Sequence, residues 1–206
     1  MATAIVNSWT TTESMNDQRT LTAEQFATEL PELPEAGRWH ELDRGRVVML
    51  QPPDLDHGNV VLNLSKAFGE WAGKASDVGY ACFELGLWVS RNPDTVISPA
   101  MSYFVAGERF AETDKRMTDV RPSLIMELAS TNDRRRAMRE RVMAYHEWGV
   151  DEVWVVDPIE KSVRLLPRGQ ASRSLSERHV LADRSVLPDF SVSVKQLFAE
   201  PEWWSG

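Results

Sequence analysis

The chain has 206 residues, 42% of them hydrophobic and 26% charged, a composition typical of one globular domain with a sizeable core. Its formal net charge of −8 argues against a protein held on nucleic acid by general electrostatic attraction. No run approaches the ~18 apolar residues of a membrane-spanning helix, the first twenty residues lack the pattern of a secretory signal, and the one cysteine, Cys82, cannot form an internal disulfide. We therefore expect a cytoplasmic protein without a membrane partner, in which Cys82 is a small buried hydrophobic residue.

Three segments are expected along the chain. Residues 1–20 are polar and without periodicity, which predicts a flexible N-terminal tail. Residues 21–199 are expected to form one folded domain. Residues 200–206 form a short C-terminal tail, in which Trp203 and Trp204 are either a loose end or a contact surface.

The N-terminal part of the expected domain has sequence patterns that predict a short helix, a hairpin and a long helix. Thr22 is a suitable N-cap for the first helix. Residues 38–53 predict two strands joined by a turn at residues 43–45. From residue 57 to residue 73, apolar side chains recur at helical spacing, which predicts an amphipathic helix.

The centre is rich in strand-forming residues. We expect strands over YACFELGLWVS (80–90) and TVISPAMSYFV (95–105), with a turn at residues 92–94 between them. After a charged loop, the apolar segment SLIMELAS (123–130) predicts a third, buried strand.

A second long helix and a hairpin complete the domain. Residues 130–133 supply capping oxygens for a helix that runs through Trp148 and is ended by Gly149. Residues 151–158 and 161–167 predict a hairpin, a further short strand follows, and residues 188–198 predict a short docked helix. Mixed strands with two long helices indicate an α/β fold, with a mixed sheet flanked by helices.

Glu127 is the most informative single residue. It lies inside an apolar strand, where a carboxylate is costly unless it meets a cation, a metal ion or several hydrogen-bond donors. The alternative is a glutamate at the end of the strand that is exposed to solvent or salt-bridged.

The helix after Glu127 places one arginine beside apolar residues. Five residues fall on one face of it at helical spacing: Arg134, Met138, Arg141, Tyr145 and Trp148. Because Met138 and Tyr145 should face the sheet, Arg141 is expected to point inward and to need an acidic partner, with Glu127 the nearest by topology. The other arginines are expected to be solvated: Arg135, Arg136 and Arg139.

Glu41 and His57 are further candidates with weaker support. Glu41 alternates with Trp39 on a strand, and His57 opens the first long helix, where a histidine is usually a cap or a surface residue. The remaining histidines have no Cys or His at a metal-ligand spacing: His40, His146 and His179.

The order of these parts resembles the Uma-two family of restriction endonucleases, a bacterial branch of the PD-(D/E)XK superfamily. The matching stretches cover roughly residues 21–199: LTAEQF, HELDRGRVV, PPDLDHGNVVLNL, TVISPAMSYFV, PSLIMELASTNDRRRAMRERVMAYHEWGVDEVWVVDP and VLPDFSVSVKQLF. The run ELASTND, followed by a helix with Tyr145, Gly149-Val150 and VWVVDP, is fairly specific as a set. The resemblance implies a restriction-endonuclease-like mixed sheet flanked by helices.

The resemblance also implies a chemistry. In such nucleases an Asp on one strand and a Glu on the next hold Mg²⁺ or Mn²⁺, which activates water for phosphodiester hydrolysis, while a Lys stabilises the developing charge. In this family the Lys lies on the following helix, and a Glu of the front hairpin and a His of the next helix often complete the pocket. The corresponding residues here are Glu127, Glu41 and His57.

Two positions depart from the family pattern. The Pro-Asp of the central strand falls on Pro99-Ala100, so that the metal-binding Asp is replaced by Ala100, and the upstream Asp94 lies in a turn six residues too early. The helix Lys position carries Arg141, which keeps the charge but has a wider, planar head that does not release a proton. Two losses in one site indicate a pseudo-nuclease in which Glu127 forms a weak metal site or none.

Three functional hypotheses follow. The first is a family member with lost or strongly reduced cleavage, retained as a binding or structural module without a cofactor. The second is an active Mg²⁺- or Mn²⁺-dependent DNA endonuclease with Glu41 or Glu84 as the second acid, although the net charge disfavours DNA as a partner. The third is a self-associating scaffold, for example a homodimer formed through Trp203 and Trp204.

Overall fold

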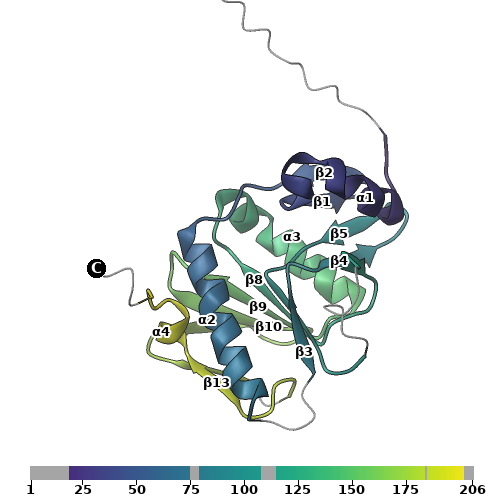
Figure 1. Cartoon of the computed structure of the whole chain (residues 1–206). Helices are drawn as coiled ribbons and strands as arrows, with labels where there is room; N and C mark the ends of the chain where they lie inside the picture. The colour runs from purple at the N-terminus through teal and green to yellow at the C-terminus, as the bar shows by residue number, and fades with distance from the viewer. Residues whose placement is uncertain (1–18, 75–78, 108–114, 184, 202–206) are drawn as a thin grey trace, which may run out of the picture.

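The structure is a computed structural model that describes residues 19–74, 79–107, 115–183 and 185–201. Most of the expected N-terminal tail lies outside these residues, as do Trp203 and Trp204. The described part is a mixed α/β fold with flanking helices, as the sequence predicts (Figure 1). Its strands form a six-stranded sheet, a five-stranded sheet and a two-stranded hairpin.

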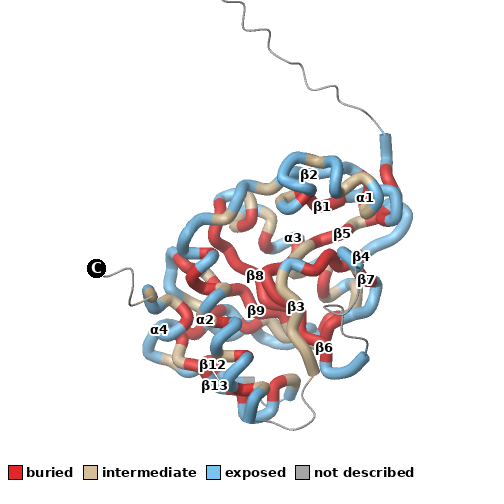
Figure 2. Tube along the Cα trace, in the orientation of Figure 1, coloured by how far each residue is buried: buried red, intermediate tan, exposed pale blue. Residues whose placement is uncertain are grey.

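The six-stranded sheet forms the centre of the molecule, in the order β11-β10-β9-β8-β6-β3. Its strands are β3 (Tyr80–Phe83), β6 (Met101–Phe104), β8 (Leu124–Leu128), β9 (Glu152–Asp157), β10 (Ser162–Pro167) and β11 (Arg173–Ser176). The β8–β9 pair is parallel and the other neighbours are antiparallel. Every residue of β8 is buried, because both faces of this sheet are covered (Figure 2).

The five-stranded sheet has the order β2-β1-β5-β4-β7. Its strands are β1 (His40–Asp43), β2 (Arg46–Met49), β4 (Gly86–Ser90), β5 (Thr95–Ile97) and β7 (Met117–Thr118). The turn between β1 and β2 is where the sequence predicts it, with Arg44 and Gly45 at φ of 48° and 78°, the left-handed region that a two-residue hairpin requires.

The helices cover the two faces of the central sheet. Helix α2 (Leu55–Ala72) packs with the hairpin of β12 (Val180–Asp183) and β13 (Phe190–Ser193) and with α4 (Val194–Leu197) on one face (Figure 1). Helix α3 (Asn132–Trp148) and part of the five-stranded sheet lie on the other face. Helix α1 (Ala23–Glu29) packs with β1 and β5 and is followed by the 3₁₀ turns η1 (Leu30–Glu32) and η2 (Pro34–Gly37).

Two expected strands are each broken, and their halves belong to different sheets. Residues 80–90 divide into β3 and β4 at Glu84, whose φ of 54° is incompatible with a continuous strand. Residues 95–105 divide into β5 and β6 around Pro99, which has no N–H for a strand ladder. Within each of these two segments the chain therefore crosses from one sheet to the other, and Glu84 and Ser98 at the crossings line the cavity of the candidate site.

Smaller differences concern the element ends. Helix α2 begins two residues before His57, because the Asp54 side chain accepts a hydrogen bond from the His57 N–H and caps the helix. The N-cap of α3, Thr131, makes no side-chain capping bond. The segment 188–198, expected to be a short helix, divides equally between β13 and the one-turn helix α4. Cys82 is half-buried on β3, and burial raises the pKa of its thiol.

Candidate functional site

Glu127 is buried on the α3 side of the central sheet. Alternation along β8 sends Leu124, Met126 and Leu128 into the core beneath α2, whereas Ile125 belongs to the core beneath α3. Glu127 shares the face of Ile125 and is only 1% exposed. A carboxylate in this position requires polar partners, and two residues of α3 provide them.

Arg141 and Tyr145 both donate hydrogen bonds to Glu127. Arg141 Nε lies 2.7 Å from Glu127 Oε1, and the Tyr145 hydroxyl lies 2.5 Å from the same oxygen. Burial by itself would lower the pKa of Arg141, but Glu127 and Glu41 together raise it well above its usual value, so Arg141 is charged. Burial and the neighbouring Glu127 raise the pKa of Tyr145, which keeps its proton for the hydrogen bond.

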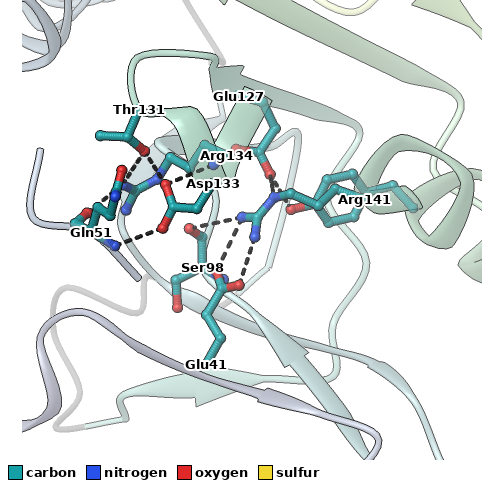
Figure 3. Close-up of polar contacts among 9 residues, drawn as sticks. Glu41, Gln51, Ser98, Glu127, Thr131, Asp133, Arg134 and Arg141 are labelled. Atoms are coloured by element: carbon teal, nitrogen blue, oxygen red, sulfur yellow. Dashed lines mark hydrogen bonds and ion pairs between the residues drawn. The ribbon is translucent and has the colours of Figure 1, made fainter. Parts of the chain in front are cut away.

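The bidentate contact of Arg141 is made with Glu41. Arg141 Nη1 and Nη2 lie 2.6 and 3.1 Å from the two carboxylate oxygens of Glu41, and Nη2 also lies 3.4 Å from the Ser98 carbonyl oxygen (Figure 3). Glu127, the acidic partner expected from the sequence, receives the bond from Nε, whereas the two ends of the guanidinium face Glu41. The Ser98 N–H donates to Glu41 at 2.7 Å.

Ala100 lies opposite Glu127. Met101 pairs with Met126 in the antiparallel register of β6 and β8, so the preceding residue, Ala100, lies next to Glu127 on the neighbouring strand. Both residues line a small cavity of about 20 Å³, together with Glu41, His57 and Glu84. Asp94 is elsewhere and accepts a hydrogen bond from the Ala23 N–H at the start of α1, which is a structural role.

His57 borders the same cavity as a buried, neutral imidazole. Its Nδ1 lies 2.8 Å from the Ser130 hydroxyl. Burial, with a smaller contribution from Arg134, lowers the pKa of His57 to about 4, although Asp54 acts in the opposite direction. At neutral pH His57 is therefore a hydrogen-bonding group without charge.

A second polar group, not expected from the sequence, fixes the loop between β2 and α2. Asp133 accepts from the Gln51 N–H at 2.6 Å, and Arg134 donates to the Gln51 carbonyl at 2.9 Å (Figure 3). Thr131 also hydrogen-bonds to Asp133. In the sequence, the capping residues at the start of α3 were the only sign of this polar group. They gave no indication that Gln51 is the partner of Asp133 and Arg134.

The remaining arginines of α3 behave differently from one another. Arg136 and Arg139 are exposed, as expected, but Arg135 is half-buried. Arg135 forms an ion pair of 2.6 Å with Asp157 at the end of β9 and hydrogen-bonds to the Ala129 carbonyl oxygen. Its expected solvation is wrong, because the carboxyl end of β9 lies beside the start of α3.

The donor set does not fit a divalent metal ion. Hard cations take several carboxylate or carbonyl oxygens, whereas the oxygens of Glu41 and Glu127 that meet in this site accept hydrogen bonds from one guanidinium. Ala100 contributes a methyl group. Within residues 19–74, 79–107, 115–183 and 185–201, no cluster of three or more His, Cys, Asp or Glu side chains is placed to hold a metal.

The mixed sheet flanked by helices is an α/β fold similar to that of a nuclease-like protein of known structure. The chain belongs to the Uma2 family, described as "Putative restriction endonuclease", which matches residues 23–195. A solved structure from Anabaena variabilis, titled as a "putative nuclease belonging to DUF820", superposes with a TM-score of 0.70 at 17% identity, covering 86% of this chain and 97% of that one. No curated protein matches significantly. No helix in the described part of the chain is long and apolar enough to cross a membrane.

Proposed function

We propose that this protein is a Uma2-family member in which metal-dependent phosphodiester hydrolysis is lost or strongly reduced, and that the nuclease scaffold is retained as a binding or structural module. The observation that carries the proposal is the position of Arg141. Its guanidinium is hydrogen-bonded to both Glu127 and Glu41, the two acids that the family resemblance assigns to the catalytic pocket.

A metal ion would have to compete with this arrangement. Restriction-endonuclease-like enzymes generally use divalent cations, held by carboxylate oxygens, to activate water and stabilise charge on the phosphate. Here the corresponding oxygens accept charge-assisted hydrogen bonds, which are short and about twice as strong as neutral ones. Entry of a cation would break these bonds and leave two like charges, Arg141 and the metal, close together.

The absence of an acid at position 100 also disfavours metal binding. Ala100 lines the small cavity together with Glu127, and its methyl group offers no ligand oxygen. The flanking residues provide no carboxylate either: Ser98 is engaged with Glu41 through its N–H, and Ser102 is fully buried within the sheet. The cavity beside Glu127, at about 20 Å³, has room for roughly one water molecule.

Arg141 then has a structural role. Glu41 belongs to the five-stranded sheet, Glu127 to the six-stranded sheet and Arg141 to α3, so one guanidinium joins three elements. In this proposal a positive charge that belongs to the protein neutralises the acids in place of a metal ion. We expect no requirement for Mg²⁺ or Mn²⁺.

An active nuclease is the second candidate. Glu84 lines the same cavity as Glu41 and Glu127, and its backbone N–H lies 3.4 Å from the Ala100 carbonyl oxygen, which supports Glu84 as a candidate third acid. If Arg141 moved away, these acids could take a cation. DNA as a partner belongs to this candidate, and the net charge of −8 disfavours it.

The test is a plasmid-nicking assay in millimolar Mg²⁺ or Mn²⁺, combined with melting curves with and without each metal. We expect no nicking above that of Glu127→Ala protein and almost no metal-dependent shift of the melting temperature, because stabilisation follows RT ln(1 + [L]/Kd). Mn²⁺-dependent nicking that Glu127→Ala abolishes would overturn the proposal in favour of the second candidate. Size-exclusion chromatography tests the separate proposal of a homodimer.

A further inference from the structure

A second, larger cavity lies next to the candidate site. It measures about 530 Å³, within the range of small-molecule sites, and is formed by α1 with its following 3₁₀ turns, the β3–β4 junction and the start of β7. We call it the basic pocket and define it by six of its lining residues: Phe26, Arg38, His40, Phe83, Arg116 and Met117. The basic pocket adjoins the small cavity of the candidate site, since both are lined by Arg38, His40, Glu84 and Ser98.

The pocket combines apolar walls with a positive lining. The half-buried Phe83 and Met117 supply ring and thioether surfaces, whereas Phe26 also lines the pocket but is only 2% exposed. Among the described residues that line it, three are cationic (Arg38, Lys115 and Arg116) and Glu84 is anionic, so the net lining charge is +2. This charge contrasts with the −8 of the whole chain.

His40, which lines both cavities, carries a buried polar atom. It is 8% exposed, and its Nδ1 has no hydrogen-bond partner within the part of the chain that the structure describes. Most buried polar side-chain atoms are satisfied, and an unsatisfied one is costly unless a water molecule or ligand completes it. An imidazole nitrogen can donate or accept a hydrogen bond. It can therefore bind a polar group that joins the charged end of a ligand to its apolar part.

We propose that the basic pocket binds an aromatic phosphate monoester. A phosphate monoester carries about −1.5 to −2 charges at pH 7, which matches the net lining charge of +2, and guanidinium groups bind phosphate oxygens bidentately. The aromatic body lies against Phe83 and Met117, and the His40 imidazole hydrogen-bonds to the ligand. Binding at this pocket does not depend on whether phosphodiester cleavage is lost.

The first test is titration calorimetry of the full chain with phenyl phosphate, in EDTA at low ionic strength. We expect saturable one-to-one binding that is at least tenfold tighter than that of phenol or inorganic phosphate, because each of these lacks one half of the recognised chemistry. The absence of saturable binding, or an equal affinity for inorganic phosphate, overturns the proposal.

Two sets of variants locate the binding. Arg38→Ala with Arg116→Ala removes two pocket cations and is expected to weaken phenyl phosphate binding at least tenfold. The matched control is Lys66→Ala with Lys74→Ala, which removes the same charge from a separate groove beside α2 and should leave the affinity unchanged. Met117→Trp fills the pocket at constant charge and should abolish binding while the circular dichroism spectrum is retained. Equal losses in the two double variants, or undiminished binding by the Met117→Trp protein, would place the ligand elsewhere.

Discussion

Arg141 and Glu41 are 100 residues apart in the sequence, and two hydrogen bonds of 2.6 and 3.1 Å join them in the interior. Glu41 lies on β1 in the five-stranded sheet, and Arg141 lies on the helix that covers the six-stranded sheet. Since the same guanidinium also contacts Glu127, this side chain holds the two sheets together. The stability of the domain should therefore depend on Arg141 more than on any other arginine of α3.

The first prediction is that Arg141→Ala lowers the free energy of unfolding by on the order of 3–5 kcal/mol, because removal of one partner leaves buried charge uncompensated. Urea unfolding monitored by tryptophan fluorescence measures the loss. Arg139→Ala is the matched control, since Arg139 is exposed on the same helix and should cost less than about 0.5 kcal/mol. Equal losses in the two variants would show that Arg141 is solvated in solution.

The second prediction concerns Tyr145. Tyr145→Phe removes the hydroxyl that donates to the Glu127 carboxylate and should cost about 1.5–3 kcal/mol, the range for hydrogen bonds to charged groups. The control is Tyr103→Phe, which removes a hydroxyl that accepts a neutral hydrogen bond from the Gly79 N–H and should cost about 0.5–1.5 kcal/mol. A Tyr145→Phe protein as stable as the parent would mean that Glu127 does not need this donor.

The third prediction concerns the pH dependence of stability through His57. Its pKa is about 4 in the folded protein and about 6.5 when unfolded, so the unfolded state binds more protons between these values. The contribution is complete above pH 6.5 and is lost as the pH falls toward 4, by on the order of 3 kcal/mol in all and about 2 kcal/mol by pH 5.

Urea unfolding of the parent and of His57→Asn at pH 7 and pH 5 measures this contribution. The parent should lose about 2 kcal/mol more than the variant between the two pH values, because asparagine does not titrate. The same loss in both proteins would show that His57 is protonated as readily in the folded state as in the unfolded state.

The fourth prediction is that a metal site can be restored. Ala100→Asp places a carboxylate opposite Glu127, and Arg141→Lys replaces the bidentate fork with a compact ammonium. Without metal, the converging carboxylates repel one another, so the double variant should be less stable than the parent. Mg²⁺ or Mn²⁺ should then raise its melting temperature, whereas the parent should not respond.

Melting curves of the parent, the double variant and Arg141→Lys alone distinguish the two substitutions. Only the double variant should respond to metal, because a single Lys adds no ligand oxygen. If metal shifts none of these proteins, Ala100 does not stand at the position of the missing ligand.

The local sequence predicts several parts of the site. Helical spacing with Met138 and Tyr145 turns Arg141 toward the sheet, and the structure buries all three residues. An acid within the apolar strand at Glu127 indicates a buried carboxylate with a cationic partner, and Arg141 is such a partner. These inferences succeed because helix and strand periodicities are local, and each fixes the side of its own element on which a residue lies.

The sequence by itself determined the helix faces and the first hairpin and left Glu127 either buried or exposed, whereas the tertiary structure buried Glu127 and decided which residues meet it. Glu41 receives the bidentate contact, and the crossings at Glu84 and Pro99 bring the edge of a second sheet to the site. The alternation of side chains along residues 80–90 and 95–105 is the same whether the segment forms one strand in one sheet or two strands in different sheets. The choice depends on pairing and stacking between segments distant in the chain, which local patterns do not encode.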